Sequence, residues 1–213
     1  MDSVTSFIYG MSMMFFSMMA FLFWRKGKEM LFRMIMWLMI VVDLQLVKDM
    51  VFFLIYGFDN EHRWYLTSSL DMMIIPFYSF VLMELVKPGW FRWVKAFMLE
   101  LPFLLLPVFY IFTHNIIWFY VLSVWGAIYG CSTFILLIFM IRRYHRQLKE
   151  RFSYQKNINL NWLLAILNTF FLILFLWTLS CFVINVDYDN IYMVSSLILW
   201  MLIDYFVYRH ESV

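Results

Sequence analysis

Residues 69–90 read SLDMMIIPFYSFVLMELVKPGW, and this stretch decides the fold of the chain. It is long and apolar enough to cross a membrane, because a hydrocarbon core of about 30 Å needs about 20 apolar residues in a helix. Yet it carries Asp71 near its start, Pro76 in its middle and Glu84 near its end. Carboxylates are rare in membrane spans and need water, a partner or a function. Either Asp71 and Glu84 lie near an interface and reach water, or Asp71 faces a polar pocket in the outer half of a helix bundle.

The composition outside this stretch is also that of an integral membrane protein. The 213 residues are 65% hydrophobic and 14% charged, whereas about a quarter of a soluble domain is charged. We therefore predict an all-α, polytopic membrane protein whose residues 1–213 form a single domain of seven transmembrane helices. The expected helices are 4–24, 30–57, 68–86, 96–113, 116–141, 162–184 and 191–208. A polar loop at Phe58–Thr67 and an acidic turn at Asn185–Asn190 are expected between them.

The distribution of basic residues predicts the orientation. The cluster Arg25–Lys28 follows the first apolar run, so this run is expected as a retained helix and not as a signal peptide. With the N-terminus outside and the C-terminus in the cytoplasm, fourteen of the sixteen Lys and Arg residues lie on the cytoplasmic side, as the positive-inside rule requires. These are Arg25, Lys26, Lys28, Arg33, Lys87, Arg92, Lys95, Arg142, Arg143, Arg146, Lys149, Arg151, Lys156 and Arg209. We expect the chain in a bacterial inner membrane.

The second apolar run contains the charges that are most costly to place in a bilayer. Asp43 is expected near mid-membrane, with Lys48 and Asp49 in the outer half. A central charge costs about 2.5–3.5 kcal/mol on insertion scales, so these side chains should face the bundle interior and pair. Adjacent helix positions point about 100° apart, so we expect Lys48 to pair with Asp71 at a similar depth and not with Asp49.

Two interpretations of this group remain open. It is either an ion pair that fixes the helix register or a polar pocket that opens to the periplasm. In the second case Asp43, Lys48, Asp49 and Asp71 are the candidate ligand site.

The longest polar segment, Arg142–Asn161, also has two interpretations. It is either a solvated extension that touches anionic headgroups or an output surface that relays a conformational change. The candidate output residues are Arg142, Arg143, Arg146, Lys149 and Arg151.

Motifs for catalysis or metal binding are missing from the sequence. Its four histidines fall in expected loops or cytoplasmic segments without a partner at ligand spacing. It contains no Gly-rich phosphate loop and no HExxH. We therefore expect no enzymatic activity, no cofactor and no metal.

Two stretches together resemble a known kind of sensor. One is Asp71–Trp90, with its acidic opening, its proline and its E-L-x-x-P-G close; the other is LKERFSYQKNINLNWL at Leu148–Leu163. They resemble the N-terminal seven-helix membrane sensor region of AraC-type helix-turn-helix regulators and of sensor histidine kinases from Bacteroidota-like bacteria. The resemblance extends over essentially the whole chain. It implies a membrane region that precedes a cytoplasmic DNA-binding or kinase domain. Residues 1–213 themselves are not expected to contain such an output domain.

The expected function is therefore that of a sensor or receptor-like module of a signalling or transcription-regulatory protein. Its expected partners are the lipid bilayer, a small-molecule ligand from the outer side and a second copy in a homodimer, without direct nucleic-acid binding by this chain. Three alternatives remain open: a small carrier of the 3+1+3 kind, an ion or proton pathway through Asp43, Asp71 and Asp204, and an accessory membrane protein without a ligand.

Overall fold

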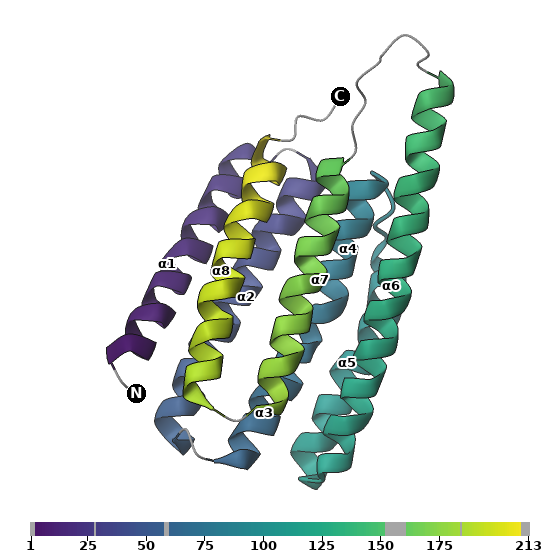
Figure 1. Ribbon diagram of the computed structural model, residues 1–213. Helices are drawn as coiled ribbons and strands as arrows, with labels where there is room; N and C mark the ends of the chain where they lie inside the picture. Colours follow the sequence, from purple (N-terminus) through teal and green to yellow (C-terminus); the bar gives the residue numbers. More distant parts are fainter. Residues whose placement is uncertain (1–2, 28, 58–59, 152–160, 184, 210–213) are drawn as a thin grey trace.

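The computed structural model describes residues 3–27, 29–57, 60–151, 161–183 and 185–209, and every regular element in these ranges is a helix. The elements are α1 (Ser3–Lys26), α2 (Met30–Tyr56), α3 (Glu61–Asp71), η1 (Met72–Ile74), α4 (Ile75–Val86), α5 (Trp93–Thr113), α6 (Ile116–Arg151), α7 (Asn161–Phe182) and α8 (Val186–Arg209). The long helices run side by side in one bundle, and the two chain ends lie at opposite ends of it (Figure 1). We call these the N-terminal and the C-terminal end of the bundle.

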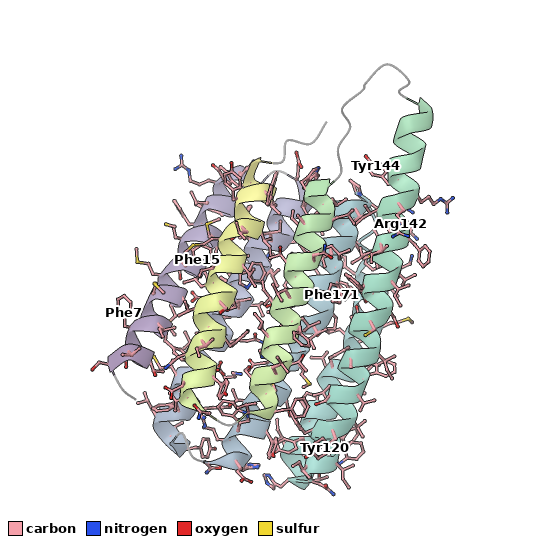
Figure 2. The ribbon with its side chains drawn as sticks, in the orientation of Figure 1. Phe7, Phe15, Tyr120, Arg142, Tyr144 and Phe171 are labelled. Carbon is pink, nitrogen blue, oxygen red and sulfur yellow. The ribbon has the colours of Figure 1, made fainter. Side chains whose placement is uncertain are left out.

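The described part of the chain contains six helical stretches that are long and apolar enough to cross a membrane. They are Ser3–Lys26, Glu61–Val86, Trp93–Thr113, Ile116–Tyr144, Trp162–Phe182 and Val186–Tyr208. Large apolar side chains also cover the outside of the bundle, among them Phe112 and Phe7, the latter labelled in Figure 2. Such extensive apolar surface marks contact with lipid or with another protein. The chain is therefore an all-helical, multi-pass membrane protein.

The third span begins earlier than the sequence predicted. Instead of a loop at Phe58–Thr67, a helix starts at Glu61, because the Asn60 side chain caps it by accepting a hydrogen bond from the Arg63 backbone N–H (3.1 Å). α3 continues through the short 3₁₀ turn η1 into α4. The turn precedes Pro76, which has no N–H to donate to the carbonyl four residues earlier. Because Pro76 stands in the first turn of α4, that missing donor interrupts no helical hydrogen bond of α4 itself.

Helices also extend into two other polar segments, beyond the predicted helix ends. α6 runs ten residues beyond its expected end at Ile141, as far as Arg151. Its 36 residues give a length of about 54 Å, and α6 projects past the other helices at the C-terminal end of the bundle (Figure 1). α8 begins at Val186, inside the predicted acidic turn, where the Asn185 side chain accepts a hydrogen bond from the Asp187 backbone N–H (2.8 Å).

Glu84 has a structural partner and does not reach water. Its side chain is 4% exposed, and its two carboxylate oxygens accept hydrogen bonds from the backbone N–H groups of Gly89 (2.7 Å) and Phe91 (2.9 Å). Gly89 takes a positive φ of 81° there, which favours glycine. The expectation that Glu84 reaches water at the interface is therefore wrong. Its carboxylate closes the turn between α4 and α5, which gives the E-L-x-x-P-G pattern a physical reason.

Candidate functional site

The N-terminal half of the bundle encloses a cavity of about 150 Å³. Its lining residues come from α1, α2, α3, α4, α6, α7 and α8, with one from η1. Along α1 the wall extends from Thr5 to Phe16, which is about 16 Å of helix. The cavity therefore reaches from the N-terminal end of the bundle to about its middle.

Three charged side chains beside this cavity form one ion cluster. The Lys48 ammonium lies 2.6 Å from Asp71 Oδ1 and 2.8 Å from Asp49 Oδ1, and it also donates to the Thr67 carbonyl (3.3 Å). The predicted pair between Lys48 and Asp71 is confirmed. The expectation that Lys48 does not pair with Asp49 is wrong, because the flexible four-carbon stem of lysine lets the ammonium bend back to the neighbouring carboxylate. One ammonium is thus shared by two carboxylates, and the three side chains are only 15–18% exposed.

The two carboxylates and the ammonium differ in where they lie. Asp49 and Asp71 line the cavity, whereas Lys48 borders a separate groove of about 430 Å³, together with Phe77 and Glu100. We infer that Lys48 approaches the carboxylates from the side away from the cavity. The cavity therefore presents carboxylate oxygens, supported from behind by the ammonium.

Asp43, the fourth residue of the predicted site, does not line the cavity. Its Oδ2 accepts a hydrogen bond from the Ser17 hydroxyl (2.6 Å), so it joins α2 to α1. Lys48 follows it five positions later, which places the two about 140° apart around the helix. The two residues were grouped because both charges were expected to face the bundle interior, without regard to this angle.

Further polar groups in the cavity wall were missed by the sequence argument. α1 contributes Thr5, Tyr9 and Ser12, and α8 contributes Asp189, whose carboxylate is hydrogen-bonded to the Tyr9 side chain. Thr5, Tyr9 and Ser12 are spaced four and three residues apart, so they occupy one face of the helix. This spacing is a signal that the sequence did contain. Arg63, which was assigned to a loop, also lines the cavity and is only 4% exposed.

The Ser12 hydroxyl is the most unusual of these groups. Its side chain is 2% exposed and lines the cavity, and its oxygen has no hydrogen-bond partner among the residues that the structure describes. Buried hydroxyl groups are nearly always paired with protein or water. An unpaired one that faces a cavity indicates that the cavity holds a polar occupant.

The part of the cavity nearest the middle of the bundle is aromatic. The rings of Tyr78, Phe170 and Trp200 lie 5.2–5.8 Å apart, and Phe16 lies 5.9 Å from Trp200. All four residues line the cavity, and they come from α4, α7, α8 and α1 respectively. The cavity is thus polar toward the N-terminal end of the bundle and aromatic toward the middle.

Comparison with known proteins gives no family for this chain. No family model matches it, and no match was found among curated proteins or among solved structures. The function of the cavity therefore has to be inferred from its own chemistry.

Two histidines lie closer together than the sequence argument allowed. The rings of His62 and His114 are 4.9 Å apart, and the Tyr110 hydroxyl lies 3.0 Å from His62 Nδ1. These contacts link α3 to the end of α5, outside the cavity lining. Over the described residues, no group of three His, Cys, Asp or Glu side chains is placed to hold a metal ion. We interpret the histidine pair as a packing contact.

The candidate output residues belong to the part of α6 beyond Ile141. Arg142 and Arg143 are exposed, and Arg142 points away from the bundle (Figure 2). Arg146, Lys149 and Arg151 continue the same helix, but their side chains lie outside the described residues. The predicted basic segment is thus a helical extension over its first ten residues.

Proposed function

We propose that the chain is a receptor-like sensor module of a signalling or transcription-regulatory protein, which binds a small molecule in the cavity. One observation carries this proposal: the charged and polar cavity is confined to one half of the bundle. Ligand sites are concave, mostly apolar and contain a few convergent polar groups, and ionisable residues within membrane spans mark functional sites by default. Asp49 and Asp71 are the central binding residues in this proposal.

The proposal includes seven spans, with α2 as the seventh, in a bacterial inner membrane. Support comes from the pairing of Asp43, Lys48 and Asp49 within the bundle, which lowers the cost of placing α2 in lipid. Basic residues such as Arg25, Lys87 and Arg142 lie at the C-terminal end of the bundle. The positive-inside rule then places that end in the cytoplasm and the cavity on the outer side.

α6 supplies a physical route for the signal. It contributes Tyr129, Gly130 and Thr133 to the cavity lining, and the same helix projects past the bundle at the C-terminal end (Figure 1). A ligand that contacts these residues differently in two arrangements of α6 would shift the balance between them. The cytoplasmic extension would then report occupancy to an output domain of the kind that the resemblance implies.

Packing in the other half of the bundle favours a sensor over an ion pathway. The cavity ends near Phe16, Leu82 and Trp200. Beyond them, fully buried side chains such as Phe23 and Leu38 fill the interior of the described bundle. An ion pathway needs a continuous polar route, and no such route leads on from the described cavity. A carrier opens its site to each side in turn, so it is distinguished by a flux measurement.

Hydrogen–deuterium exchange of the full chain in lipid nanodiscs tests the sensor function. The chain is measured with and without separate panels of small amines, carboxylates and sugars. We expect one panel to slow exchange in the cavity helices and, at the same concentrations, to change exchange in residues 142–151. Asp71→Asn should abolish both changes while leaving the other helices as protected as before. Panels without effect, or gradient-driven flux of an effective compound across liposomes, would contradict the sensor function.

A further inference from the structure

The charges around the cavity do not balance. Among the described residues, three carboxylates line it (Asp49, Asp71 and Asp189), while Arg63 lines it and Lys48 supports it from behind. The excess is concentrated at the ion cluster, where one ammonium faces two carboxylates. An uncompensated charge in a low-dielectric interior is costly. A monovalent cation in the cavity, like a proton on one of the carboxylates, would restore the balance, whereas an anion would increase the excess.

The unpaired hydroxyl of Ser12 offers a polar partner to such an occupant. It is 98% buried and lines the same cavity, and its oxygen lacks a hydrogen-bond partner within the described part of the chain. The buried Thr67 hydroxyl, also in the lining, is unpaired in the same sense. Each oxygen can accept a hydrogen bond from an occupant that donates N–H groups. An ammonium group has up to three such donors.

The aromatic end of the cavity suits the remainder of such a molecule. Tyr78, Phe170 and Trp200 present ring surfaces to the cavity. Cations and the alkyl groups attached to them bind within about 6 Å of aromatic faces, with tryptophan the strongest partner. These rings therefore complement the carboxylates and do not compete with them.

We propose that the cavity binds a small organic ammonium ion. An engineered protein cavity of about 150 Å³ accepts benzene, so this cavity of about 150 Å³ suits a cation of about six non-hydrogen atoms. Its charged end lies between the Asp49 and Asp71 carboxylates and the Ser12 hydroxyl. Its apolar part lies on Phe170 and Trp200. The assignment rests on the proposed sensor function, because it names the ligand class of the same site.

Binding of matched probes to the full chain tests this assignment. The chain is placed in zwitterionic nanodiscs in an amine-free buffer and titrated calorimetrically with choline, n-butylammonium, 3,3-dimethyl-1-butanol and butanoate. The dimethylbutanol has the shape of choline without its charge. We expect saturable binding of n-butylammonium, whose three N–H groups can pair with the hydroxyl oxygens, and weaker binding of choline, which carries the charge but no N–H. The neutral and anionic compounds should be weaker than their ammonium counterparts by about tenfold or more.

Variants locate the site. Asp71→Asn should weaken ammonium binding by about tenfold or more, and Trp200→Leu by about threefold. Asp43→Asn is the matched control, because Asp43 is a carboxylate on α2 outside the cavity, and binding should be unchanged. Thermal unfolding checks that each variant is folded, and Asp49→Asn replaces Asp71→Asn if the latter unfolds.

The possible failures are distinguishable. If the neutral or anionic probe binds as tightly as its ammonium counterpart, or if Asp43→Asn weakens binding as much as Asp71→Asn, the ammonium assignment is wrong and the sensor function stands. If no ammonium probe binds while the carboxylate or sugar panel changes exchange in residues 142–151, the ammonium assignment is wrong and the sensor function stands. If no probe binds and no panel changes exchange, both proposals fail.

Discussion

Replacing Lys48 with methionine tests whether the ion cluster holds α2 and α3 together. Methionine keeps a long side chain but removes the ammonium that Asp49 and Asp71 share at 2.8 and 2.6 Å. Breaking a buried pair by removing one partner costs about 3–5 kcal/mol. We expect a loss near the lower end, about 3 kcal/mol, because either remaining carboxylate can take up a proton. All three side chains are less than one fifth exposed, so water screens the cluster only weakly.

A double-mutant cycle separates this interaction from other effects. Asp71→Asn combined with Lys48→Met leaves only the Asp49 carboxylate, so the double variant should lose less than the sum of the single losses. For charges this close we expect a coupling of about 2 kcal/mol. Reversible unfolding in mixed micelles measures each free energy. Lys87→Met is the matched control, since Lys87 is exposed at the C-terminal end, and its loss should stay within about 0.5 kcal/mol. Strict additivity, or a Lys48→Met loss as small as that of the control, would refute the shared ion pair.

Two further substitutions test structural assignments made from hydrogen bonds. Glu84→Gln should destabilise the chain by about 2–4 kcal/mol in the same unfolding assay. The reason is that the amide NH₂ replaces one of the two charged oxygens that accept from the N–H groups of Gly89 and Phe91. A loss below that of Lys87→Met would contradict the role of Glu84 in closing the turn. Asn60→Ala should cost about 1 kcal/mol, because it removes the cap of α3, and should speed hydrogen exchange at residues 61–64 alone; faster exchange throughout the bundle would argue against a local cap.

The places of the apolar helices along the chain could be predicted from the sequence, but their number and several of their ends could not. Apolar runs identify the part of a helix that contacts lipid or the core, and each such run is helical in the structure. The ends depend instead on caps and on helix propensity outside the membrane. Asn60 and Asn185 start α3 and α8 within segments that were predicted as loops. The polar residues after Ile141 continue α6 because many of them favour helix.

The candidate site was predictable only in part, for a geometric reason. Lys48 and Asp71 could be matched because depth along two neighbouring spans can be counted from the sequence. Asp43 does not line the cavity, and its direction around the helix relative to Lys48 was not part of the prediction. The hydroxyl-bearing face of α1 was overlooked because hydroxyl groups cost little in an apolar run, although its spacing was visible. Arg63 was missed because its segment was predicted as a loop.

If the chain were an accessory protein without a ligand, three energetically unfavourable features of the bundle would have no explanation. A pair that only fixes helix register needs one cation and one anion, but here Lys48 faces two carboxylates. A purely structural core would pair the Ser12 hydroxyl or replace it with alanine, and it would fill a cavity of about 150 Å³. All three features occur in one place, and proteins break packing and pairing rules mainly where function requires it. A bound ammonium ion would neutralise the excess charge, pair the hydroxyl and fill the space together, so ligand binding accounts for what packing alone does not.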